Sequence, residues 1–202
     1  MYIKWEGPLI TFNPKSGLDL QATHPNGVRV PNYGNYGGPL NSGGIPVDDL
    51  DIFFKNHDDL ITNAIKNGNG VPSSQDFVKA HAHLFGEILS LEPDEDGLLV
   101  VERANEEIVA DPEATLYAGF TLFGLTAHVM QLDKLDDPKN PNLLGVFEVE
   151  LAKFDPALNV STVLTNAAEY METGLEAVPP NEAKGLNGLF HIWEHQFDTL
   201  IA

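Results

Sequence analysis

The stretch YGNYGGPLNSGGIPVDDLDIFFKNHDDL, residues 33–60, decides the fold of the chain around it. Its first half holds five glycines within twelve residues, which is typical of a backbone that makes tight bends. Its second half predicts a helix, because apolar residues and one histidine recur at steps of three and four. These residues are Val47, Leu50, Phe54, His57, Ile61 and Ile65. Pro46 precedes the predicted helix, and Gly68 ends it.

The rest of the chain predicts a mostly α fold. Residues 1–46 are rich in glycine, proline and asparagine, which favours extended segments and loops. Residues 143–154, LLGVFEVELAKF, fit a strand or a helix, because apolar and polar side chains alternate along part of them. Helical patterns cover 74–91, with Ser73 or Ser74 as the cap, and also 112–135, 161–178 and 186–202.

Composition excludes several classes of function. The 202 residues fit one domain, and their formal net charge of −19 opposes binding to nucleic acids and charge-driven docking on anionic lipid. The chain has no cysteine, which excludes disulfides, thiol catalysis and cysteine-bound zinc. No apolar run is long enough to cross a membrane, and no signal peptide is recognisable at the N-terminus.

The adjacent residues His57 and Asp58 have a chemical interpretation. Histidine is the side chain most readily poised as a general base near neutral pH. Asp58 projects about 100° further round the helix, so the two side chains face different directions. A carboxylate beside a glycine-rich loop suits a hard cation, because glycine lets backbone carbonyl oxygens turn toward Ca²⁺.

These residues resemble the calcium loop and catalytic helix of secreted-type phospholipase A2. The family pattern is Y-G-x-Y-x-G, then G-x-P, then an aspartate and H-D on the helix. The matching residues here are Tyr33, Gly34, Tyr36, Gly38, Gly44, Pro46, Asp51, His57 and Asp58. The loop is one residue longer than in the animal enzymes, between Gly38 and Gly44. The chain is also similar to the cysteine-free phospholipase A2 domains of bacteria and parvovirus capsids, with Phe53 and Phe54 in place of paired half-cystines.

The resemblance implies calcium-dependent hydrolysis of the sn-2 ester of glycerophospholipids at a membrane or micelle surface, and it favours a secreted or exported protein. His57 would be the general base, and Asp76 on the partner helix would orient it. The alternative for Asp76 is a purely structural role at the N-terminus of that helix. The implied calcium ligands are the Asp58 carboxylate and the backbone carbonyls of Tyr36, Gly38 and either Leu40 or Asn41.

The implied fold is a phospholipase A2-like core of two antiparallel helices behind a calcium loop, within residues 1–98. Residues 99–202 would add C-terminal helices packed in the same domain. One alternative is a catalytically silent module of the same fold that binds calcium, a membrane or a protein. This alternative is favoured by the lengthened loop and by Asp59 and Ile61, which stand where the family often has a tyrosine that bonds the orienting acid. A second alternative is an unrelated helical calcium-binding or interaction protein.

Three other motifs carry weaker signals. His191, Glu194 and His195 fit the zinc motif H-x-x-E-H, but an amphipathic helix with polar flanks explains them better. The same terminal helix could lie in a lipid interface, although packing on the core is the favoured interpretation. His81 and His83 point to different faces of one helix and are interpreted as surface or core histidines, and His128 shows no partner signal.

Overall fold

The computed structural model describes residues 3–4, 9–13, 17–21, 28–29, 32–38, 43–68, 70–134 and 142–179. This part of the chain is mostly helical, as the sequence predicts, with small antiparallel sheets. The helices are α1 (Asp49–Asn67), α2 (Ser74–Ile88), α3 (Pro112–Lys134), α4 (Leu143–Leu151) and α5 (Val160–Ala177). The strands are β1 (Ile3–Lys4), β2 (Leu9–Asn13), β3 (Gly17–Gln21), β4 (Val28–Arg29), β5 (Asn32–Tyr33), β6 (Val100–Glu102) and β7 (Ile108–Ala110).

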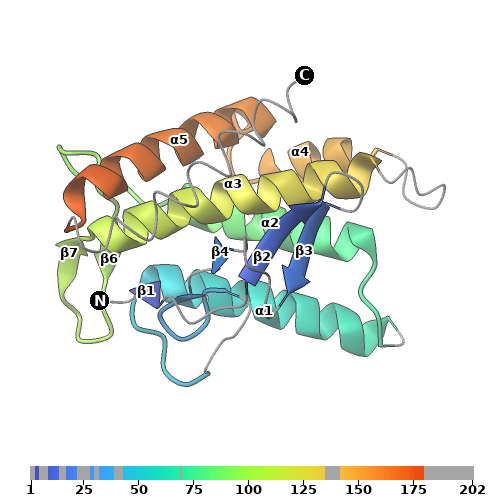
Figure 1. Cartoon of the computed structure of the whole chain (residues 1–202), viewed down its shortest axis with the longest axis horizontal. Coiled ribbons are helices and arrows are strands. Elements are labelled where there is room, and N and C mark those ends of the chain that lie inside the picture. Colours follow the sequence, from blue (N-terminus) through green and yellow to red (C-terminus); the bar gives the residue numbers. More distant parts are fainter. Residues whose placement is uncertain are drawn as a thin grey trace.

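The helices pack around α3, which runs between α5 on one side and α1 and α2 on the other (Figure 1). α1 and α2 lie antiparallel, joined by a short turn, and α4 packs on α2. The N-terminal strands pair as β1 with β5 and as a three-stranded sheet in the order β3-β2-β4. The expectation of extended segments before Pro46 is therefore confirmed.

The helix ends follow the local capping signals. Asp48 caps α1 by accepting a hydrogen bond from the backbone N–H of Asp51, and Gly68 closes that helix by donating to the carbonyl of Ala64. Ser73 caps α2 through a reciprocal capping box with Asp76. These side chains satisfy backbone groups that a helix end leaves without intrahelical partners, so short-range sequence is enough to place the ends.

Residues 143–151, where the sequence left strand and helix open, form α4. Leu143, Phe147 and Leu151 are buried at steps of four, which is the spacing of one helix face. Val149 is 64% exposed, although strict alternation would bury it with Phe147 and Leu151. Because these residues pack against α2 and α3, the segment forms a helix rather than a strand.

A hairpin formed by β6 and β7 has no counterpart in the sequence prediction, because each strand is only three residues long. It holds the N-terminal end of α1. The backbone N–H of Ala104 donates to the carbonyl of Val47 (3.0 Å), and that of Glu102 donates to the carboxylate of Asp49 (3.0 Å). The hairpin therefore fixes the point at which the glycine-rich loop enters the helix.

α3 and α5 approach closely because glycines lie at their contact. A Cβ atom on Gly174 of α5 would stand 2.6 Å from the backbone nitrogen of Leu116, and one on Gly119 of α3 would stand 2.8 Å from the carbonyl oxygen of Ala167. Backbone atoms cannot move aside as the end of a flexible side chain can. A larger residue at either position would therefore push the two helices apart.

Gly174→Ala is expected to lower the free energy of unfolding by about 3 kcal/mol, because overpacking at a backbone contact strains the α3–α5 interface. Urea denaturation followed by circular dichroism measures this change. Glu169→Ala, on the exposed side of the same helix, is the matched control and should stay within about 0.5 kcal/mol of the wild type. Equal stability of the two variants would contradict the close contact.

The predicted helix 186–202, with His191, Glu194 and His195, lies outside the described residues, as do His24, Leu40 and Asn41. In the described part of the chain, no helix has the length and apolar character that a membrane span requires.

Candidate functional site

The glycine-rich loop is attached to α1 through the carboxylate of Asp51. This side chain is fully buried and accepts three backbone N–H groups: Asn35 at 2.9 Å, Tyr36 at 2.7 Å and Val47 at 3.0 Å. Gly34 adopts a positive φ of 55°, and a Cβ there would stand 2.5 Å from the Asp51 carboxyl carbon. Glycine is required at this position both by backbone conformation and by space.

A second carboxylate supports the same loop. The backbone groups of Tyr33 and Gly37 bond reciprocally, N–H to carbonyl, at 2.8 and 2.9 Å, and close a tight turn. The Tyr33 hydroxyl donates to the Asp48 carboxylate, which also caps α1. The Tyr33 ring stacks on Tyr117 of α3, with ring centroids 5.3 Å apart, and Phe54 meets Tyr117 edge-on at the same distance. Apolar packing around Phe54 thus holds the loop and helix together without a cross-link.

The stability of this arrangement is expected to depend on pH through Asp48. Burial raises the pKa of its carboxyl to about 6, against the opposing effect of hydrogen bonds from Tyr33 and Asp51. The folded chain therefore holds this proton at a pH where the unfolded chain has lost it. The contribution of Asp48 is complete below its ordinary pKa of about 4 and is lost as the pH rises through about 6, by about 3 kcal/mol.

Asp48→Asn tests this dependence, because asparagine stays neutral and caps a helix as well as aspartate does. Free energies of unfolding measured at about pH 4 and about pH 7.5 should show the wild type losing about 3 kcal/mol relative to the variant. Parallel pH dependence of the two proteins would contradict the raised pKa.

Asp58 lies on the face of α1 that carries the loop. It follows Asp51 by seven residues, which is two helical turns or about 10 Å along the axis. Both carboxylates act on the same buried group: the pKa of the Tyr117 hydroxyl is raised by burial and then by the charges of Asp51 and Asp58. The structure therefore brings Asp58 to the side of the helix where Tyr33 stacks on Tyr117.

Two of the predicted carbonyl ligands, Tyr36 and Gly38, lie in the first part of this loop. The peptide N–H of Tyr36 bonds to Asp51, its hydroxyl donates to the carbonyl of Gly44 (2.8 Å), and Gly38 adopts a positive φ of 105°. Within the described residues, the carbonyl oxygens of Tyr36 and Gly38 accept no hydrogen bond. Backbone carbonyls and a carboxylate are oxygen donors of the kind Ca²⁺ prefers. No cluster of three or more histidine or acidic side chains suited to a metal ion occurs in this described part, so a metal here would depend on backbone oxygens.

His57 faces α2 and makes its contact there with another histidine. Its Nε2 lies 2.9 Å from Nδ1 of His81, and the two rings are stacked with centroids 5.1 Å apart. Nε2 of His81 in turn lies 2.9 Å from Nδ1 of His128 on α3. The other nitrogen of His57, Nδ1, lies 3.5 Å from the Asp58 carboxylate, and the His57 side chain is 16% exposed.

Asp76, the expected orienting acid, is engaged elsewhere. Its carboxylate accepts hydrogen bonds from the backbone N–H (2.8 Å) and the hydroxyl (2.7 Å) of Ser73, and these bonds lower its pKa. This is the structural role that the sequence left open for it. His81, five residues later on α2, is the residue that the structure brings to His57.

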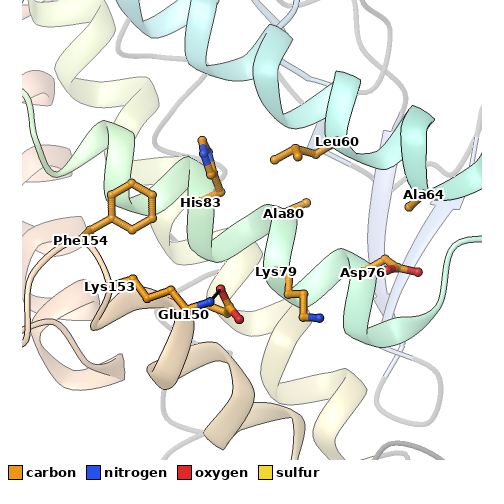
Figure 2. Close-up of a pocket in the computed structure, with 9 residues that line it drawn as sticks. All are labelled: Leu60, Ala64, Asp76, Lys79, Ala80, His83, Glu150, Lys153 and Phe154. Carbon is orange, nitrogen blue, oxygen red and sulfur yellow. Dashed lines mark hydrogen bonds and ion pairs between the residues drawn. The ribbon is translucent and has the colours of Figure 1, made fainter.

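A pocket of about 430 Å³ lies beside this site, between α1, α2 and the end of α4 (Figure 2). Asp76 stands at one end of it, and His83 and Phe154 stand at the other. The remaining lining residues are Leu60, Ala64, Lys79, Ala80, Glu150 and Lys153. Leu60 follows His57 by one turn of α1, so the pocket adjoins the histidine without including it.

The sequence contains a signal for the burial of His81. Phe77, His81, Leu84 and Ile88 follow one another at steps of four and three, so His81 belongs to the buried stripe of α2. Its neighbour His83 is 44% exposed, as expected for the opposite face. His128 shows no such signal, because α3 buries side chains on most of its circumference and periodicity does not single out one face.

Comparison with known proteins returned no match: no family model, no curated protein and no solved structure resembles the chain closely enough to identify it.

Proposed function

We propose that the chain is a calcium-dependent, phospholipase A2-like enzyme that hydrolyses the sn-2 ester of glycerophospholipids. The observation that carries this proposal is the arrangement on α1. Asp51 holds the glycine-rich loop on one face, Asp58 lies two turns further along that face, and His57 stands beside Asp58 with one nitrogen bonded to a neighbouring helix. The proposed calcium ligand and the proposed general base are therefore neighbours on one helix.

The oxygen donors fit calcium better than a transition metal, because no thiolate is present and the histidines of α1, α2 and α3 bond to one another. The Asp58 carboxylate and the carbonyls of Tyr36 and Gly38 would hold the ion, with Leu40 or Asn41 as a further carbonyl ligand. Bound calcium would supply positive charge that polarises the ester carbonyl and offsets the charge developing on its oxygen.

His57 would act as the general base through Nδ1. It would take a proton from a water molecule while that water attacks the ester carbonyl carbon. Cleavage of the bond between the carbonyl carbon and the glycerol oxygen would release the fatty acid. The proton held by His57 would pass to the departing glycerol oxygen and leave a lysophospholipid. Asp58, which faces the loop, would take no part in this proton transfer.

Single exposed apolar side chains near this site could contact a lipid aggregate. Large apolar side chains are exposed along the loop, α1 and the turn that follows, and each could enter the interface of a membrane or micelle. These side chains are Ile45 (79% exposed), Ile52, Leu60, Ile65 and Val71 (73% exposed). Because the chain carries a net charge of −19, zwitterionic lipid is the expected surface rather than anionic lipid.

Zwitterionic phosphatidylcholine vesicles test the proposal directly. Fatty acid release should require calcium at about 1 mM or below and stop when a chelator is added. Asp58→Asn should lose both calcium binding, measured by calorimetry, and hydrolysis. Calcium binding without hydrolysis by the wild type would indicate the silent binding module instead. Absence of calcium binding would reject both the enzyme and the silent binding module.

A further inference from the structure

Three histidines from three helices form one continuous line of ring nitrogens. Nε2 of His57 on α1 meets Nδ1 of His81 on α2, and Nε2 of His81 meets Nδ1 of His128 on α3, each at 2.9 Å. The Phe77 ring flanks both His81 and His128, with centroid distances of 6.2 and 5.9 Å. The same pairing, Nε2 of one ring with Nδ1 of the next, occurs at both links.

His81, the central residue, is neutral. It is 2% exposed, and burial, followed by the influence of His57 and His128, lowers its pKa well below the ordinary value. A neutral imidazole has one N–H donor and one nitrogen acceptor. Since both nitrogens of His81 lie at hydrogen-bond distance from another ring, one must donate and the other must accept. The chain therefore has two complete arrangements, which run in opposite directions.

The two arrangements differ in the tautomer of every ring. In the first, His57 and His81 donate from Nε2 toward α3, and a neutral His128 also carries its proton on Nε2. In the second, all three rings carry the proton on Nδ1. Free histidine favours the Nε2–H tautomer, so the first arrangement is favoured at each ring. The second would end on an Nδ1–H of His57 that lies 3.5 Å from Asp58, which is too long for a strong hydrogen bond.

We propose that His81 and His128 are positioning residues that hold His57 in the Nε2–H tautomer, with the lone pair of Nδ1 on the side of Asp58. The tautomer of a residue on α1 is thus coupled to that of a ring on α3, through a buried ring on α2. Its consequence for catalysis rests on the proposed hydrolysis, because only a base acting through Nδ1 needs this tautomer. The hydrogen-bonded chain itself does not depend on any activity.

Two-bond ¹H–¹⁵N correlation spectra of the full chain read the tautomers directly. At about pH 8.5, roughly two units above the ordinary histidine pKa, His57, His81 and His128 should all show the Nε2–H pattern. His83, whose side chain is 44% exposed and which contacts Glu87 and the Phe154 ring rather than another histidine, is the internal reference and should show an averaged or independent state. An Nδ1–H pattern or averaging at His57 would overturn the proposal.

Substitutions of His128, the last of the three histidines, test the direction of the hydrogen bonds between them. His128→Leu removes the acceptor for the Nε2–H of His81, and His57 should then lose its single tautomer. His128→Asn keeps an acceptor near the position of Nδ1 and should preserve it. His83→Leu is the matched control on α2 and should leave the spectrum of His57 unchanged. Thermal unfolding by circular dichroism confirms that each variant folds. A folded His128→Leu whose His57 spectrum matches the wild type would overturn the proposal.

Kinetics separate this inference from the proposed function. His128→Leu should lower kcat about tenfold with KM unchanged, because an outer partner of a reacting group orients it without touching the substrate. His128→Asn should recover most of that loss. If the wild type shows fixed tautomers but hydrolyses no phospholipid, the hydrogen-bonded line of histidines is supported and the proposed enzymatic function is rejected. Hydrolysis with unchanged kcat in His128→Leu would support the enzyme and overturn the positioning role.

Discussion

Replacing His57 by glutamine is expected to reduce fatty acid release from phosphatidylcholine vesicles by roughly 10³-fold, within the range for loss of a general base. Glutamine fits the same helix position and can still bond to His81, but its amide cannot accept a proton near neutral pH. The cation ligands proposed here do not include His57, so calcium affinity measured by calorimetry should stay within about twofold of the wild type.

His83→Gln is the control for this experiment, since it makes the same replacement on the exposed side of α2 and should keep full activity. Substantial hydrolysis by His57→Gln would contradict the proposed mechanism even if calcium dependence were present. Loss of calcium binding in the same variant would instead show that His57 holds the loop or the ion.

Replacing Asp51 by alanine is expected to lower the free energy of unfolding by about 4 kcal/mol. The carboxylate is fully buried and accepts backbone N–H groups from Asn35, Tyr36 and Val47, and alanine leaves all three without that acceptor. The loop would detach from α1, so calcium affinity should fall as well. Urea denaturation in the presence of a chelator measures the first effect, and calorimetry measures the second.

Asp59→Ala is the matched control, because Asp59 lies on the same helix with its carboxylate exposed and paired with Lys55. An exposed ion pair contributes about 0–1 kcal/mol, so this variant should remain close to the wild type. If Asp51→Ala destabilised the chain no more than Asp59→Ala does, the loop would have to be held by other contacts.

Helix ends were predictable because they depend on residues close in the chain. The capping side chains of α1 and α2 lie within three residues of the N–H groups that they satisfy. α4 was not predictable in the same way. Its alternating sequence fits two periods, and only the burial of Leu143, Phe147 and Leu151 against other helices distinguishes them.

The same distinction between local and long-range contacts applies to the candidate site. His57 and Asp58, which lie on one helix, were proposed from the sequence, because they follow the glycine-rich loop at the spacing that carries the family resemblance. The partner of His57 was expected at Asp76, which the structure shows bonded to Ser73. A single sequence does not determine the axial offset at which two antiparallel helices pack. An offset of five residues decides whether Asp76 or His81 lies next to His57.

The amino-acid sequence by itself determined a mostly helical chain, the loop and helix that carry His57 and Asp58, and the residues at which α1 ends and α2 begins. Each of these depends on hydrogen bonds and periodicities within a few residues. Tertiary structure decided that Asp51 holds the loop and that His57, His81 and His128 meet ring to ring. Those contacts join residues 15 to 47 positions apart, and they arise only when helices pack at a particular offset.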